Sequence, residues 1–177
     1  GFLMPRVDAH HEIHKLYGPS DRKLAFPDAG WGFLIRASRN LAAAFDVVHR
    51  HGHVVGDVNQ GNVVVSRQAT VRLIDCDSFQ VTHLGHTYPC RVGVPLFTPP
   101  ELQGQRLDAV QRTPEHDRFG LAVLVFHLLF MGRHPFAGRH PERVLPVEAA
   151  IREGLFAFGP EARRQGWQPP PFSLTLD

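Results

Sequence analysis

The stretch HVVGDVNQGNVVV, residues 53–65, constrains the fold of this chain more than any other part of it. A short apolar run ends at Gly56. A polar stretch with Asp57, several amides and a glycine follows, and three valines come directly after Asn62. Asp57 and Asn62 stand five positions apart between hydrophobic stretches, so we interpret them as polar groups at the mouth of a core. The fold must therefore bring a polar loop to the edge of its interior.

The spacing of apolar residues predicts the elements on either side of this loop. Residues 30–52 place apolar side chains three and four positions apart, which indicates one amphipathic helix that ends at Gly52. Residues 62–66 are rich in valine and 71–75 alternate, so they predict a short hairpin with its turn at 67–69.

Further along the chain the pattern becomes mostly helical. Residues 80–98 show no period, and PPEL at 99–102 predicts the start of a helix with proline in its first turn. Residues 117–131 are apolar nearly all round, which indicates a buried central helix, and 146–154 predict one further short helix. We expect Trp31 and the phenylalanines to lie in the core.

Composition excludes several classes of protein. A chain of 177 residues fits one domain with a real core, and a dispersed net charge of +2 argues against a nucleic-acid role for this segment. Cys76 and Cys90 lack CxxC spacing, so neither a disulfide framework nor a zinc knuckle is indicated and a reducing cytosol is expected. The longest apolar run, 119–131, is shorter than the roughly 20 residues that span a bilayer.

One hairpin would bring two carboxylates and an amide together. Asn62 and Asp75 offer hard oxygen ligands suited to Mg²⁺, which binds through few protein oxygens and the phosphates of a substrate. Asp57 could then orient or deprotonate an attacking hydroxyl. The simpler alternative is that these residues cap the turns of the hairpin, as Asp and Asn commonly do.

The sequence resembles the C-terminal lobe of the protein kinase fold. The stretch VVGDVNQGNVVV resembles the catalytic loop, LIDCDSF the metal-binding Asp-Phe-Gly segment, VPLFTPPEL the end of the activation segment, and HDRFGLAVLVFHLLFMGRHPF the buried helix F with its following turn. The four motifs occur in the right order and cover nearly the whole chain. More narrowly, GDVNQGN with LIDCDSFQV is similar to the bacterial kinase-like proteins of the TerY-phosphorylation triad, the helix-hairpin-helix kinases.

The resemblance implies a role for each motif residue. Asp57 would be the catalytic base, and Asn62 and Asp75 would be Mg²⁺ ligands. Asp117 would hydrogen-bond the backbone of the catalytic loop, although it could equally be an ordinary helix N-cap. Glu101 would pair with an arginine, for which no match is evident. The residues expected at the adenine of ATP are Leu3, Met4, Arg6, Val64 and Ile74.

The implied fold is mostly α with a small β-hairpin region. Its parts are a hinge at 1–7, helices D and E at 8–52, the catalytic loop and metal-binding hairpin at 53–79, the activation segment at 80–102, and helices F and G with the following segment at 103–177. Both ends look cut, so we expect a fragment without the N-terminal lobe and, by itself, without activity.

Several residues depart from the family pattern. Val55 and Gly56 replace the His and Arg of the catalytic loop, so control by a phosphorylated activation loop is not expected. Asn59 replaces a Lys that supports the transferring phosphate, which removes a cation from the developing charge. Cys76 and Asp77 replace Phe and Gly, which shrinks an apolar plug and adds a third carboxylate.

The resemblance implies an ATP- and Mg²⁺-dependent protein serine/threonine kinase that acts in the cytoplasm in bacterial signalling or stress response, including tellurite resistance. Its partners would be a protein substrate, a von Willebrand A-type TerY-like protein and a metal-dependent phosphatase, with no nucleic acid or membrane involved. One alternative is a pseudokinase or isolated-lobe scaffold that binds the von Willebrand-type partner. Another is a small-molecule phosphotransferase, against which PPEL and the turn at 132–136 argue.

The histidines suggest a metal site only weakly. In HHEIH at 10–14 the pair that flanks the glutamate is one residue short of the spacing that a metalloprotease helix needs. The group HRHGH at 49–53 lies at a predicted helix end, where cationic histidine offsets the macrodipole. We therefore expect no zinc site.

Overall fold

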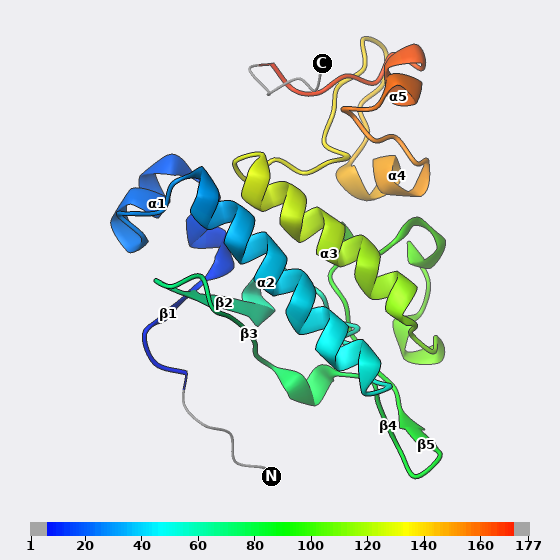
Figure 1. Ribbon diagram of the computed structural model, residues 1–177. Helices are drawn as coiled ribbons and strands as arrows, with labels where there is room; N and C mark the ends of the chain where they lie inside the picture. Colours follow the sequence, from blue (N-terminus) through cyan, green and yellow to red (C-terminus); the bar gives the residue numbers. More distant parts are fainter. Residues whose placement is uncertain (1–6, 172–177) are drawn as a thin grey trace.

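The computed structural model describes residues 7–171, and Figure 1 shows the order of their helices and strands. Helices combine with small antiparallel sheets, which agrees with the kinase-like C-terminal lobe that the sequence predicts. The elements are β1 (His10–Glu12), α1 (Pro19–Ala25), α2 (Trp31–Arg50), β2 (Val63–Ser66), β3 (Val71–Leu73), β4 (Val81–His83), β5 (His86–Tyr88), α3 (Pro114–Leu129), α4 (Val147–Arg152) and α5 (Pro160–Arg164).

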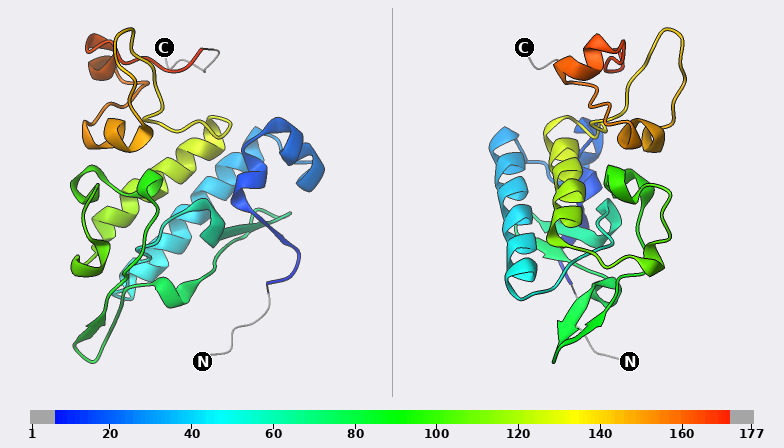
Figure 2. Two further views of the ribbon diagram at one scale, coloured as in Figure 1. Left: turned by 180° about the vertical axis from the view of Figure 1, so that it is seen from behind. Right: turned by 90° about the vertical axis from the view of Figure 1, so that its right-hand side faces the viewer.

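Helix α2 confirms the predicted amphipathic helix and lies alongside α3 in both Figure 1 and Figure 2. The chain leaves the helix at Gly52, whose φ of +77° suits glycine. The prediction that Trp31 lies in the core is wrong, since this side chain is 61% exposed. Trp31 and the exposed Ile35 occupy the face of α2 away from its buried stripe, which consists of Phe33, Leu34, Ala37, Leu41 and Phe45.

A three-stranded antiparallel sheet, ordered β1-β2-β3, packs beneath α2. Side chains alternate between the faces of a strand, so Val63 and Val65 enter the core while Val64 points to the opposite face. Strand β1 is a difference from the prediction, because the range 8–52 was expected to contain helices D and E alone. A strand of three residues is too short to show alternation, and its pairing with the distant β2 defines it.

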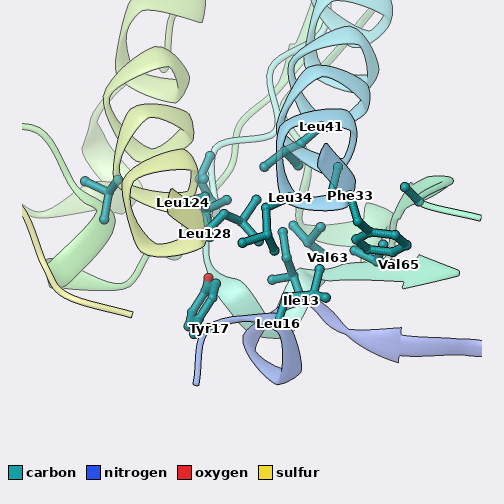
Figure 3. Packing of buried hydrophobic residues seen from close by; sticks show 14 of the residues in the cluster. Ile13, Leu16, Tyr17, Phe33, Leu34, Leu41, Val63, Val65, Leu124 and Leu128 are labelled. Atoms are coloured by element: carbon teal, nitrogen blue, oxygen red, sulfur yellow. The ribbon is translucent and has the colours of Figure 1, made fainter. Parts of the chain in front are cut away.

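The core forms where α2, α3, the sheet and the 3₁₀ turn Ile13–Leu16 meet (Figure 3). Leu124 and Leu128 of α3 point toward Leu34 and Leu41 of α2, and Tyr17 lies at the edge. A second cluster covers the end of α3 and is built from α4, α5 and the segments beside them; its buried members are Ala150, Leu155, Ala157, Phe158, Ala162 and Trp167.

Helix α3 begins before the predicted Asp117. Its N-cap is Thr113, whose N–H donates to Nδ1 of His116 at 3.0 Å, and Pro114 is the first helical residue. The alternative that Asp117 is an N-cap is therefore wrong, because Asp117 lies one turn inside the helix. No helix of the described residues is both long and apolar enough to cross a bilayer.

Two loop predictions also need correction. The stretch at 99–102 begins no long helix; it forms the single 3₁₀ turn Pro100–Leu102, and the chain then turns at Gly104 with φ +77°. The segment 80–98, expected to be irregular, contains the β4–β5 hairpin. Its turn is formed by Leu84 and Gly85, which both have positive φ. Each of its strands has only three residues, which is too short for a pattern of alternation to be recognised in the sequence.

We expect acid to destabilise the fold through His127. This side chain is buried, no hydrogen-bond partner for either ring nitrogen lies among the described residues, and burial, with His134 nearby, lowers its pKa from 6.5 to about 4. The unfolded chain then binds the extra proton, so stability present above pH 6.5 should fall by up to about 3 kcal/mol toward pH 4.

Denaturant unfolding at pH 7 and pH 4.5 measures this loss. The variant His127→Phe, which can keep the ring contacts with Tyr17 and Phe97, should show a smaller loss than the wild type. The exposed His83 provides the matched control His83→Phe. An unchanged pH dependence in His127→Phe would show that other groups cause the acid sensitivity.

Candidate functional site

The loop that carries Asp57 is anchored to the body of the protein before the catalytic motif begins. The backbone of Val54 exchanges two hydrogen bonds with Gln80, at 3.0 and 2.9 Å. This isolated bridge joins the residues that enter the loop to the segment that follows the β2–β3 hairpin. Both ends of the candidate site are therefore held together by backbone bonds.

A buried carboxylate from α3 holds the next two residues. Asp117 is 1% exposed; its Oδ2 accepts the N–H of Val55 and its Oδ1 accepts the N–H of Gly56, both at 2.8 Å. This is the backbone contact that the kinase resemblance implies for Asp117. Because a buried carboxylate is tolerated only when it is well hydrogen-bonded, the loop and the helix stabilise each other.

His49 adds a third donor that the sequence analysis missed. Its Nε2 donates to Oδ2 of Asp117 at 2.8 Å, and its side chain is only 13% exposed. Spacing placed His49 at a helix end, but it could not reveal a partner that lies 68 positions further along the chain. The C-terminal turn of α2 is thus tied to the base of the same loop.

Gly56 is required by close packing as well as by backbone conformation. It has a φ of +73°, and a Cβ added to it would lie 2.6 Å from both Cβ and Sγ of Cys90. The Cγ of Arg112 would lie 3.7 Å from the same Cβ. The Arg that kinases carry at this position therefore has no room here. The nearby Cys90 is buried, and burial raises the pKa of its thiol.

Asp57 and Asn62 lie together across the loop. The Nδ2 of Asn62 donates to the backbone oxygen of Asp57 at 3.0 Å and to its Oδ2 at 3.1 Å. Asn59 donates to the same backbone oxygen at 3.2 Å and accepts the N–H of Gly61, so it shapes the turn. The Oδ1 of Asp57 is buried and has no hydrogen-bond partner among the described residues.

Asp75 approaches Asp57 from the end of the hairpin. It has a φ of +60°, and Ser78 donates from Oγ to its backbone oxygen at 2.9 Å. A hydrogen bond with Asp77, then desolvation, and then the negative charges of Asp77 and Asp57 raise the pKa of the Asp75 carboxyl. The structure thus brings Asp57, Asn62 and Asp75 to one place, with Asp77 as a further carboxylate.

The expected adenine-binding residues are placed only in part. Val64 is buried on the face of β2 away from the core, and the half-buried Ile74 bonds the backbone oxygen of Asn62 through its N–H at 3.0 Å. Leu3, Met4 and Arg6 lie outside the described residues. Val64 and Ile74 therefore lie on the same hairpin as the polar site, close to Asn62.

Glu101 has no arginine partner among residues 7–171. Its Oε1 instead lies 3.9 Å from Nε2 of His116, in the first turn of α3, and its side chain is 58% exposed. A contact of this length at an exposed carboxylate contributes little. The pairing that the resemblance implies for Glu101 is not found in this part of the chain.

The oxygen atoms of Asn62 and Asp75 suit a cation whose other ligands are water and substrate phosphates. Within residues 7–171 no three side chains of His, Cys, Asp or Glu are placed to hold a metal ion. The Nδ2 of Asn62 donates to Asp57, so the Oδ1 of the same amide could serve as a ligand of a cation, and Asp75 offers a carboxylate. Two protein oxygens with substrate phosphates and water are the usual environment of Mg²⁺.

Comparisons with known proteins agree with the kinase resemblance. No family model matches the chain. It is 45% identical over 179 residues to protein kinase YegI of Escherichia coli K12, in an alignment that covers 99% of this chain and 28% of YegI. It is 27% identical over 140 residues to serine/threonine-protein kinase PknK of Mycobacterium tuberculosis H37Rv, covering 77% of this chain and 12% of PknK.

A solved structure shows the same fold. The yeast RNA Pol II CTD kinase CTDK-1 complex contains a chain with a TM-score of 0.53 and 20% identity, matched over 73% of this chain and 39% of that one. The chain therefore has a protein kinase-like fold. It spans just over a quarter of the length of YegI.

We expect Asp117→Asn to destabilise the protein strongly. The amide retains one acceptor oxygen and turns an N–H₂ group toward a backbone N–H, so at least one buried bond is lost, at a cost of about 1.5–3 kcal/mol. Asp46, an exposed α2 residue paired with Arg50, supplies the control Asp46→Asn, which should cost under about 0.5 kcal/mol. Denaturant unfolding compares the two, and equal losses would contradict the role given to Asp117.

A matched pair of glycines tests the packing at the loop. Gly52 and Gly56 have nearly equal φ values, of +77° and +73°, but a Cβ at Gly52 meets nothing within 4 Å. Gly52→Ala should therefore cost only the backbone strain of about 1 kcal/mol. Gly56→Ala adds the clash with Cys90, which we expect to cost about 1–3 kcal/mol more. Thermal or denaturant unfolding measures both, and similar losses would contradict tight packing at Gly56.

Proposed function

We propose that this chain carries the catalytic loop of an ATP- and Mg²⁺-dependent protein serine/threonine kinase. The observation that supports this most directly is the hydrogen bonding of Asn62 to Asp57. The two residues lie on a loop whose backbone is hydrogen-bonded by the buried carboxylate of Asp117. The kinase relatives support the same class of reaction. Because this chain spans 28% of YegI and 12% of PknK, a kinase activity is a proposal for it.

In the proposed reaction Asp57 receives the proton of a serine or threonine hydroxyl. The hydroxyl oxygen forms a bond to the γ-phosphorus of ATP, the bond from that phosphorus to the bridging oxygen of ADP breaks, and the proton passes to Asp57. The carboxylate of Asp57 would accept this proton while the amide of Asn62 holds its Oδ2 in place. Asn62 thereby orients the base as well as facing the cation.

The remaining residues would position the nucleotide. Asn62 and Asp75 would hold Mg²⁺ through one amide and one carboxylate oxygen, and the bound ion would neutralise charge on the phosphates. Val64 and Ile74 would contact the adenine from the free face of the hairpin. Leu3, Met4 and Arg6 would meet its edge.

A pseudokinase scaffold is a second candidate, and one observation favours it. Asp75 shares a hydrogen bond with Asp77, and this contact raises the pKa of Asp75. A carboxyl group whose pKa is raised binds a cation less readily, because protons compete with the cation for its oxygens. The absence of a Lys at Asn59 works in the same direction, since fewer positive charges face the phosphates.

We further infer a protein substrate and place the activity in bacterial signalling or stress response in the cytoplasm. The specific partners proposed are a von Willebrand A-type TerY-like protein and a metal-dependent phosphatase. Support for these partners comes from the stretches GDVNQGN and LIDCDSFQV alone. In the scaffold alternative the von Willebrand-type protein would bind without being phosphorylated.

Phosphate transfer from labelled ATP with Mg²⁺ tests the proposal in the longest natural form of the protein. Asp57→Asn and Asp75→Asn should each reduce transfer by about a hundredfold or more, because a base or a metal ligand is lost. The exposed Asp46→Asn should leave it unchanged. If the wild type binds Mg-ATP and its partner but transfers no phosphate, the scaffold is the correct function.

A further inference from the structure

Arg112 is a buried cation to which the proposed reaction assigns no role. It lies just before α3 and is 3% exposed. Its backbone N–H donates to Oε1 of Gln80 at 2.8 Å, and its backbone oxygen accepts a hydrogen bond from Nε2 of Gln80 at 2.7 Å. Because the backbone of Gln80 in turn pairs with Val54, the main chain of Arg112 is tied to the residues that enter the loop of Asp57.

The side chain of Arg112 lies between this loop and residues 90–93 of the expected activation segment. Its stem lies beside Gly56, since a Cβ added to that glycine would be 3.7 Å from Cγ of Arg112 and 2.6 Å from Sγ of Cys90. At its head, Nη2 donates to the backbone oxygen of Val92 at 2.9 Å. The Sγ of Cys90 donates to the same oxygen at 3.3 Å. Arg112 therefore lies against both segments at once.

No carboxylate forms an ion pair with this guanidinium within residues 7–171. Its Nε is buried without a hydrogen-bond partner, and none of the ion pairs of the described residues includes Arg112. Arginine stays charged in proteins, and burial of a charge without a direct partner costs folding free energy. An apolar side chain of similar length would fill this space at a lower cost, but it would lack the donor to Val92.

The charge of Arg112 also lies close to the candidate base. Burial raises the pKa of the Cys90 thiol, whereas its hydrogen bond to Val92 and the charge of Arg112 lower that pKa. The carboxylates of Asp57 and Asp117 act in the opposite direction and raise it. The three charged groups therefore lie within electrostatic range of one buried sulfur atom.

We propose that Arg112 is a positioning residue, which holds residues 90–93 against Gly56 and thereby fixes the backbone that carries Asp57. Its effect on phosphate transfer rests on the proposed kinase function, whereas the coupling of the two segments does not. Asp117 binds the loop from α3, and Arg112 supports it from the side of residues 90–93. Both contacts would hold the base in one position relative to the substrate hydroxyl, which proton transfer requires.

Hydrogen exchange measures the coupling in the longest natural form of the protein and requires no phosphate transfer. Arg112→Met keeps an unbranched apolar stem and removes the charge and the donor to Val92. We expect the amides of 54–57 and of 90–93 to exchange about tenfold faster, and those of α2 to keep their rates. The control Arg118→Met removes an exposed arginine of α3 and should change neither segment. Unchanged exchange at 54–57 in Arg112→Met would overturn the proposal.

Steady-state kinetics with labelled ATP separate positioning from a general structural role. We expect Arg112→Met to lower kcat about tenfold and to leave the KM for ATP unchanged, because the base is displaced while the residues expected at the adenine are not. Arg112→Lys, whose ammonium group can donate to Val92, should recover part of the rate. A rise in KM with an unchanged kcat would overturn the assignment.

Denaturant unfolding of the same variants supplies the folding control. Arg112→Met should be as stable as the wild type, because removal of an unpaired buried charge offsets the lost hydrogen bond. A parallel loss of stability and rate in both variants would make Arg112 a structural residue and overturn its positioning role. If Arg112→Met does not fold, Arg112→Lys decides: it should show smaller changes in exchange at 54–57 and in kcat, and wild-type values of both would refute the proposal.

The two readouts distinguish a failure of this proposal from a failure of the kinase proposal. If the wild type transfers no phosphate, the kinase proposal and the catalytic effect of Arg112 are both wrong, and hydrogen exchange alone shows whether Arg112 couples the segments. If the wild type transfers phosphate and folded Arg112→Met has the same kcat, the positioning role is wrong and the kinase function stands. Faster exchange with an unchanged kcat would also overturn the positioning role.

Discussion

The buried carboxylate of Asp117 is the interaction on which the candidate site depends. It accepts the N–H groups of Val55 and Gly56 from the loop and the Nε2–H of His49 from α2. A desolvated carboxylate needs hydrogen-bond donors, and these three also fix the backbone of the loop just before Asp57. One charge in α3 therefore fixes the residues that immediately precede Asp57 and ties α2, α3 and the loop into one unit.

Packing in the same region bears on one departure from the kinase pattern, the glycine at position 56. Gly56 replaces an arginine, and Cys90 and Arg112 occupy the space beside it. Arg112 reaches the activation segment through Val92 from the opposite side. A buried cation is thus present near the activation segment, and it comes from the residues before α3. This arrangement suits a segment that is held by fixed contacts without a phosphorylated residue.

Much of the fold could be predicted because its signals are local. The apolar stripe of α2, the run of valines in β2 and the apolar sequence of α3 each lie within one segment, and the polar loop between α2 and β2 is also evident in the sequence. The errors occur where the pattern is short or the partner is distant. Strand β1 and both strands of the β4–β5 hairpin have only three residues each. Trp31 lies on the solvent-exposed face of α2, outside its apolar stripe.

The order and spacing of Asp57, Asn62 and Asp75 followed from the sequence alone, because a hairpin between them leaves few ways to arrange the three side chains. The hydrogen bond from the amide of Asn62 to Asp57, and the burial of the Asp57 Oδ1 without a partner among the described residues, were decided only by the tertiary structure. The same holds for His49 and Arg112, whose partners are distant in the chain. Local periodicity determines which face of an element is buried, whereas the folded packing of separate elements determines which polar groups meet and which charge stays unpaired.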